Sequence, residues 1–186
     1  MTVETARRLL TVQEFYRMCE TGILLPEERL ELANGEIITM APIGSAHHWC
    51  VMQLTRVLGA LIGDRAWVSV QGPLAIGPHD LRYPDLAILR PRGGTYRASG
   101  PSALDALLVI EVADTTVTYD REVKVPLYAA AGIPEAWLLD LPAARLEVYR
   151  DPVEGAYRQT RRLSREESIA VEAFPDVTLQ LADLLG

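Results

Sequence analysis

The chain has 186 residues, 49% hydrophobic and 23% charged, which is the composition of an ordinary globular protein and excludes a disordered or fibrous one. Its apolar runs are too short to cross a bilayer and its first residues do not resemble a secretion signal, so we expect a cytoplasmic location. The net charge of −7 disfavours a protein that binds nucleic acid through a broad basic surface.

We expect one domain over residues 1–186, with a core at about 29–150 and a C-terminal extension at 151–186. Cys19 and Cys50 lack the spacing of a disulfide framework or a zinc site and are predicted to be buried thiols. Lys124 is the only lysine among 18 basic residues. A buried site that needs a compact ammonium, able to lose its proton, would not accept arginine there.

The first part of the chain predicts a short helix, a hairpin and a long helix. Thr11 is a candidate cap for an amphipathic helix over Val12–Glu20. Asn34 and Gly35, a pair favoured in turns with positive φ, join predicted strands at 29–33 and 36–40. Apolar residues then recur at helical spacing from Ser45, the candidate cap, to about residue 63.

The remainder alternates short apolar runs with Gly and Pro. Strands are predicted at 67–70, 74–76, 83–89 and 107–112, a polar and mobile loop at 91–101, a helix at 120–131, a hairpin of 136–140 with 145–150, an edge strand at 157–163 and a helical turn within 177–185. This order predicts an α/β domain with an N-terminal hairpin.

Two predicted strands carry an acid in an apolar setting. Glu111 lies near the end of Leu-Leu-Val-Ile-Glu-Val, and a carboxylate buried there needs a metal ion, a cation or a raised pKa. Asp85 follows Pro84 at the start of the other strand. Carboxylates on neighbouring strands can share Mg²⁺. The plainer interpretation places Glu111 in solvent at the strand exit and Asp85 in a turn.

Asp120 and Lys124 are four residues apart on the next predicted helix. This spacing by itself favours an ordinary ion pair between an acid that caps the helix and a lysine one turn later. The alternative is that Lys124 points over the end of the sheet, where it could orient or deprotonate an attacking water.

The sequence closely resembles the Uma-two family of restriction endonuclease-like proteins. The resemblance extends from Arg29 to Arg150 and rests on LELANGEIITMAP, His47, Gln71, YPDLAIL, LLVIEVADTT, YDREVK and LYAAAGIPEAWLLDL in this order. It implies the PD-(D/E)XK nuclease superfamily, whose restriction endonuclease-like core is a mixed central sheet flanked by helices and whose site binds Mg²⁺ or Mn²⁺.

The resemblance also implies the roles of individual residues. Asp85 and Glu111 would be metal ligands, with the carbonyl of Val112 as a third. The lysine that usually follows the glutamate by two residues is replaced by Ala113, and Lys124 would take its place. The remaining implied residues are Glu31 as an accessory catalytic acid, Asp120 orienting Lys124, and His47 and Gln71 next to the substrate.

Some of these residues have simpler interpretations. His47 and His48 could lie on the surface at a helix start, Gln71 could only finish a strand, and Glu31 could be an ordinary hairpin residue. Arginines near the Asp85 strand are candidate phosphate contacts or a solvated rim, namely Arg82, Arg90, Arg92 and Arg97.

The leading hypothesis is a Mg²⁺- or Mn²⁺-dependent endonuclease that hydrolyses phosphodiester bonds in DNA as a homodimer or higher homo-oligomer. The alternative is a catalytically silent nuclease fold that binds a protein or nucleic-acid partner, which the acidic charge favours. A glycosidase using Asp85 and Glu111 ranks last, because only 6% of the residues are aromatic.

Overall fold

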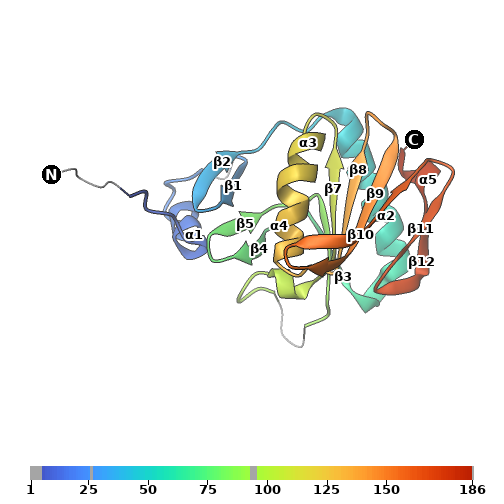
Figure 1. Ribbon diagram of the computed structural model, residues 1–186. Helices are drawn as coiled ribbons and strands as arrows, with labels where there is room; N and C mark the ends of the chain where they lie inside the picture. Colours follow the sequence, from blue (N-terminus) through green and yellow to red (C-terminus); the bar gives the residue numbers. More distant parts are fainter. Residues whose placement is uncertain (1–5, 26, 93–95, 186) are drawn as a thin grey trace.

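The computed structural model describes residues 6–25, 27–92 and 96–185. Its centre is a six-stranded mixed sheet in the order β10-β9-β8-β7-β6-β3, in which β7 and β8 form the parallel pair. A second sheet, β2-β1-β5-β4, is antiparallel, and β11 and β12 form a separate hairpin (Figure 1). The predicted mixed sheet flanked by helices is confirmed.

The helical segments are α1 (Val12–Glu20), α2 (Ser45–Ile62), α3 (Val117–Tyr119), a π-helical turn (Asp120–Lys124), α4 (Val125–Ala130), α5 (Leu181–Leu185) and two 3₁₀ turns (Gly63–Arg65 and Ala103–Asp105). The strands are β1 (Leu30–Ala33), β2 (Glu36–Thr39), β3 (Trp67–Val70), β4 (Leu74–Gly77), β5 (Asp80–Arg82), β6 (Leu86–Leu89), β7 (Ala106–Ala113), β8 (Glu135–Asp140), β9 (Arg145–Val153), β10 (Ala156–Leu163), β11 (Ser168–Val171) and β12 (Phe174–Gln180). No helix among the described residues is long and apolar enough to cross a membrane.

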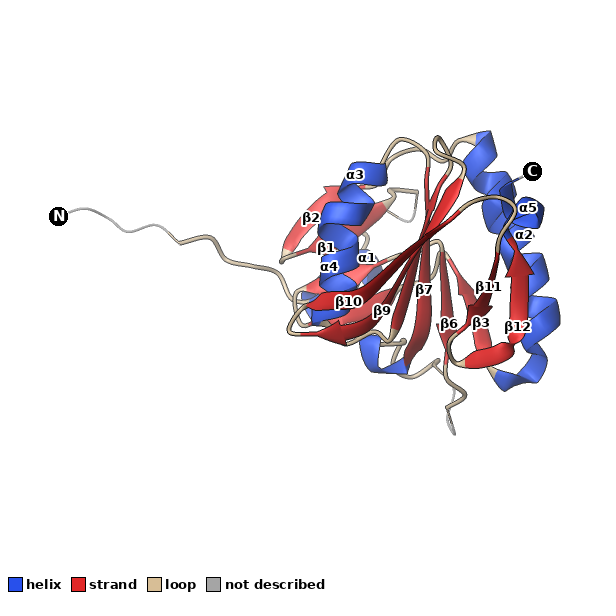
Figure 2. Ribbon diagram, turned by 45° about the vertical axis from the view of Figure 1, so that its right-hand side comes forward, coloured by secondary structure: helices blue, strands red, loops and turns tan. Residues whose placement is uncertain are grey.

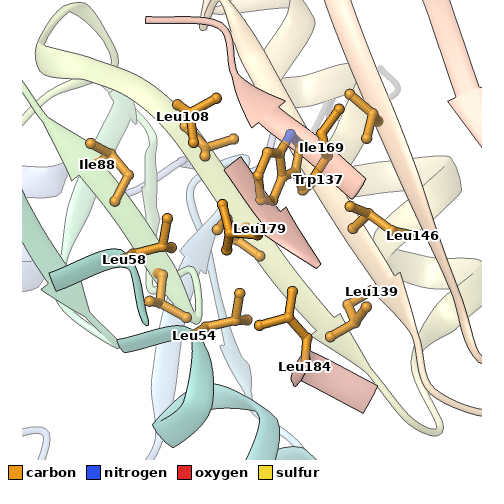
Figure 3. Close-up of a cluster of buried hydrophobic side chains, with 14 of the residues drawn as sticks. Leu54, Leu58, Ile88, Leu108, Trp137, Leu139, Leu146, Ile169, Leu179 and Leu184 are labelled. Atoms are coloured by element: carbon orange, nitrogen blue, oxygen red, sulfur yellow. The ribbon is translucent and has the colours of Figure 1, made fainter. Parts of the chain in front are cut away.

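Helices cover both faces of the central sheet. Figure 2 shows α2, α5 and the β11–β12 hairpin on one face, with α3 and α4 on the other. On the face covered by α2, Leu54 and Leu58 of that helix pack with Trp137 and Leu179 in a buried hydrophobic cluster (Figure 3). Because side chains alternate along a strand, Ile110 of β7 faces this cluster while Val109 faces α4.

Several predicted elements are confirmed. Thr11 caps α1 in a capping box with Glu14. Asn34 and Gly35 have φ of 48° and 75° in the β1–β2 turn, as the Asn-Gly signal predicted. The hairpin of β8 with β9 and the edge position of β10 also agree with the prediction.

The strand predicted at 83–89 is confirmed only from Leu86 to Leu89, because the chain changes sheets just before Leu86. β5 ends at Arg82 in the small sheet and β6 starts at Leu86 in the central one. Pro84 between them has no N–H to continue a ladder, and the N–H of Tyr83 donates instead to Glu31 Oε1 at 2.9 Å. Asp85 therefore lies on the connection that joins the two sheets.

The helix predicted at 120–131 begins earlier, at Val117, and contains the π-helical turn. Pro126 lacks an N–H and its ring clashes with the carbonyl four residues before it in a regular helix. The N–H of Val125 accordingly bonds to the carbonyl of Asp120, five residues back. Asp120 is thus inside the helix rather than its cap, while Gly132 ends it at φ 73° as predicted.

Other expectations need smaller corrections. The N-cap of α2 is Gly44, which makes no side-chain bond, so Ser45 is not the cap. Cys50 is buried, but Cys19 is exposed because it lies on the outer side of α1. The helical turn predicted within residues 177–185 is confirmed as α5, which follows directly on β12, whereas strands β5, β11 and β12 were not predicted. Residues 93–95 of the loop predicted to be mobile lie outside the described residues.

Arg121 fastens the π-helical turn to the central sheet. Its guanidinium donates to Glu147 Oε2 at 2.9 Å and to Asp140 Oδ2 at 3.1 Å. Burial raises the pKa of Glu147, but the hydrogen bonds from Arg121 and Tyr149 outweigh burial and the pKa is lowered. This ion pair holds the helix that carries Lys124 against β8 and β9.

Candidate active site

Asp85 and Glu111 emerge on the same face of the central sheet. β6 pairs antiparallel with β7 and places Leu86 opposite Ile110, so the next pair along is Asp85 and Glu111. Opposed residues of an antiparallel pair point to the same side. Both carboxylates are buried, Asp85 at 7% and Glu111 at 3% exposure, so the interpretation of Glu111 as solvated at the strand exit is wrong. Asp85 lies at a bend between β5 and β6, but its side chain is buried.

Two residues of the helical segment opposite bind the carboxylate of Glu111. The Nζ of Lys124 lies 3.0 Å from Glu111 Oε2, and the hydroxyl of Tyr128 donates to Oε1. The same Nζ is 3.2 Å from Asp120 Oδ1. Tyr128 was not found by sequence analysis, although its position four residues after Lys124, one helical turn on, was a signal for it.

Asp85 is held by three donors. His47 Nε2 lies 3.0 Å from Oδ2, the N–H of Val112 donates to Oδ2 at 2.9 Å, and Gln71 Nε2 donates to Oδ1 at 3.2 Å. Gln71 also donates its backbone N–H to the carbonyl of Asp85 and has a φ of 47°. His47 and Gln71 thus contact Asp85 directly, whereas His48 is exposed.

Glu31 lies at the same site, and its carboxylate is held by two donors of the small sheet and its exit. Its Oε2 accepts from Arg82 Nη1 at 3.3 Å and its Oε1 from Tyr83. Arg82 is 1% exposed and also donates to Asp80 and Tyr119. A guanidinium so enclosed cannot contact a phosphate, which corrects one of the candidate phosphate contacts.

The other candidate arginines lie at the far end of β6. Arg90 follows the strand at the end opposite to Asp85, and five residues of strand span about 17 Å. Arg92 pairs with Asp105 at 3.7 Å, and Arg97 lies further along the same loop. None of these three lines the cavity around Asp85.

The site opens into a cavity of about 490 Å³, hereafter the catalytic cavity. Its lining includes five carboxylates but only two guanidinium or ammonium groups, Arg29 and Lys124. The carboxylates are those of Glu31, Asp85, Glu111, Asp114 and Asp120. Apart from Arg82, which pairs with Glu31 from outside this lining, the negative charge is in excess, and such an excess raises the pKa of an acid placed within it.

The pKa values at the site reflect that charge. Burial raises the pKa of Glu111 to about 8, with Asp85 adding to the rise and Lys124 opposing it. Burial lowers the pKa of Lys124, but attraction to Glu111 and Asp120 outweighs it and the pKa is raised. The raised pKa favours the ammonium form of Lys124.

The donors present fit a hard divalent cation. Asp85, Glu111 and the backbone carbonyl of Val112 offer oxygen, and the added positive charge would relieve the surplus of carboxylates. Across the described ranges no group of three side-chain ligands is preassembled. Mg²⁺ usually takes one or two protein carboxylates and completes its shell with waters and substrate phosphates, so two acids suffice.

Comparisons with known proteins agree with this architecture. The family model Uma2, described as "Putative restriction endonuclease", matches residues 12–182. The crystal structure of a putative nuclease belonging to DUF820 from Anabaena variabilis ATCC 29413 superimposes with a TM-score of 0.73, at 19% identity, over 95% of this chain and 97% of that one. At that identity the likeness establishes a shared fold.

The type IIG restriction endonuclease BpuSI is similar over 80% of this chain and 17% of that one, with a TM-score of 0.46 and 14% identity. A TM-score below 0.5 does not establish a shared fold. No curated protein matches the chain. Since the family model covers nearly the whole sequence, the chain belongs to the Uma2 family of restriction endonuclease-like proteins.

Proposed function

We propose that the protein is a Mg²⁺- or Mn²⁺-dependent endonuclease that hydrolyses phosphodiester bonds in DNA. The supporting observation is the convergence of Lys124, from a helix, on Glu111, which is paired across two strands with Asp85, in a cavity with surplus negative charge. Two carboxylates can hold a divalent ion and an ammonium can stabilise the negative charge that develops on phosphorus, which suits metal-assisted phosphoryl transfer.

Asp85, Glu111 and the carbonyl of Val112 would hold the ion. When bound, a divalent cation polarises the phosphate and lowers the pKa of its water. Lys124, held between Glu111 and Asp120, keeps a positive charge where negative charge develops on phosphorus.

The surrounding residues keep this set in place. His47 and Gln71 orient the Asp85 carboxylate, and Tyr128 orients that of Glu111. Glu31, close to Lys124 and fixed by Arg82, serves as the accessory acid.

The test is cleavage of supercoiled plasmid and labelled oligonucleotides by purified protein in Mg²⁺ or Mn²⁺. Parent protein should cut, while Lys124→Ala protein, and parent protein with a chelator, should not. Circular dichroism of the variant separates loss of chemistry from loss of fold. Equal cleavage by the parent and by a folded Lys124→Ala variant would exclude the enzyme activity.

A catalytically silent module is the second candidate, favoured by the net charge of −7 and the scarcity of cations at the cavity. Calorimetry with Mn²⁺ discriminates the two. A silent module predicts that Glu111→Gln protein binds the ion as the parent does, whereas the endonuclease predicts weakened binding. A cytoplasmic location and a homodimer belong to the endonuclease proposal, and sedimentation tests the dimer.

A further inference from the structure

A second cavity of about 380 Å³ adjoins the catalytic cavity. Arg29, Met40 and Tyr83 line both, so the two cavities share a wall. Gln71 lines the second cavity while its amide donates to Asp85. A ligand in the second cavity therefore lies directly beside the group proposed to hold the metal ion.

The walls of this second cavity are mainly apolar and aromatic. Phe15, Leu24 and Met40 line it together with the half-buried ring of Tyr83, and Leu25 lines it at 48% exposure. Its size lies within the range of about 300–1,000 Å³ that small-molecule sites occupy. A flat heteroaromatic group with a polar edge fits such a site, since aromatic side chains bind bases by stacking.

The charged and amide side chains that line the second cavity are those of Glu28, Arg29 and Gln71, and the Glu28 carboxylate already accepts the N–H of Leu25 at 2.7 Å. Arg29, on the shared wall, carries five N–H donors, one of which is bonded to the carbonyl of Ala41 at 2.7 Å. A base is linked to its phosphate through one sugar, so a base pocket must share a wall with the phosphate site. Arg29 is the cation at that boundary.

The charge of the site argues against recognition of an intact duplex. Duplex binding relies on many contacts between cations and phosphates. Here Arg82 is enclosed, Arg90 lies at the opposite end of β6, and the catalytic cavity has an excess of carboxylates. Affinity for a substrate has to come from another source, and stacking of a base supplies it.

We propose that the second cavity binds one unstacked nucleobase of the substrate, and that the preferred substrate is therefore single-stranded or frayed nucleic acid. The inference rests on the proposed nuclease function, and it adds the substrate class. The proposal is tested by binding measured without cleavage. It can therefore fail while the nuclease activity is confirmed, and it can hold while no nuclease activity is found.

Cys19 provides the measurement, because it lines the second cavity and is exposed while Cys50 is buried. Partial burial raises the pKa of the Cys19 thiol, so alkylation by N-ethylmaleimide is followed by mass spectrometry at mildly alkaline pH, with a chelator to prevent cleavage. A single-stranded oligonucleotide should slow alkylation about tenfold at saturation. An abasic oligonucleotide of the same length, and a duplex whose two ends are closed by linkers without bases, should leave the rate unchanged.

The alkylated protein is itself the second test, because the adduct fills the cavity. Its affinity for the single-stranded oligonucleotide should fall at least about tenfold, equivalent to ~1.4 kcal/mol. Cys19→Ser protein treated with the same reagent should bind as the parent does. Protection by the abasic strand equal to that by the normal strand, or unchanged affinity after alkylation, would overturn the proposal.

Discussion

Tyr128 and Lys124 bind opposite oxygens of the Glu111 carboxylate from adjacent turns of one helical segment. Tyr128 has 0% exposure, so its hydroxyl has been taken wholly out of water to make this bond. A donor placed so deeply orients the carboxylate and favours its ionised form. Both oxygens of the Glu111 carboxylate are therefore fixed in position by the helical segment.

Replacing Tyr128 with Phe should shift the pH dependence of cleavage. The Tyr128 hydrogen bond lowers the pKa of Glu111, so its loss raises that pKa and moves the rise of activity with pH to higher pH. The free energy of unfolding should fall by about 1–3 kcal/mol, because a buried acceptor loses its donor. Rate profiles in Mg²⁺ and urea denaturation check both, and an unshifted profile in a folded variant would contradict the assigned role.

Lys124→Arg and Lys124→Met separate charge from shape. A guanidinium is planar and larger than the ammonium that contacts Glu111 and Asp120, so Lys124→Arg should lose at least about 100-fold in cleavage rate. Lys124→Met leaves buried carboxylates uncompensated and should cost about 3–5 kcal/mol of unfolding free energy.

The pH dependence of the Lys124→Met effect has a definite sign. Lys124 lowers the pKa of Glu111, so the folded variant takes up a proton more readily than the parent. Its destabilisation should be smaller at pH 6 than at pH 9 in urea denaturation. A destabilisation independent of pH would contradict the pairing of these two side chains.

Gln71→Leu should weaken Mn²⁺ binding about 10- to 100-fold, the usual effect of removing a group that orients a metal ligand. The side chain of Gln71 is only partly buried, so the fold should survive. Gln159→Leu, an exposed site on the edge strand β10, is the matched control. Titration calorimetry checks the affinity, and equal binding by the two variants would remove Gln71 from the site.

Mn²⁺ affinity should fall as the pH is lowered. Glu111 must be ionised to bind the ion, and its pKa is raised by burial to about 8. Below that pH each unit should weaken binding up to about tenfold, and binding should release protons. Calorimetry in buffers of different ionisation enthalpy measures the release. In Glu111→Gln protein this component of the pH dependence should be absent.

Glu147 should make the fold sensitive to acid. Its folded pKa is lowered from the ordinary 4.5, so its contribution is present above pH 4.5 and is lost as the pH falls through the folded value. Glu147→Gln should cost about 1–3 kcal/mol at pH 7, and the difference should diminish on acidification. Exposed Glu166→Gln serves as the control in thermal melts across pH. A difference that stays constant on acidification would argue against the Arg121 pair.

Sequence alone determined the features that depend on local chemistry. The Asn34-Gly35 pair predicted a turn, because both residues readily adopt the positive φ that the turn has. An acid within the apolar sequence of β7 predicted that Glu111 is buried and needs a partner. The solitary Lys124 and the family motifs singled out the cation.

Tertiary structure decided the contacts that join distant segments. At Pro84 the chain passes from one sheet to the other, which puts Asp85 on a connection, and Pro126 induces the π-helical turn that contains Lys124. Helical spacing places Tyr128 one turn after Lys124, but its bond to Glu111, and the bond of Gln71 to Asp85, depend on how separate segments pack together. Periodicity reports which face of an element is buried, and only packing determines what that face meets.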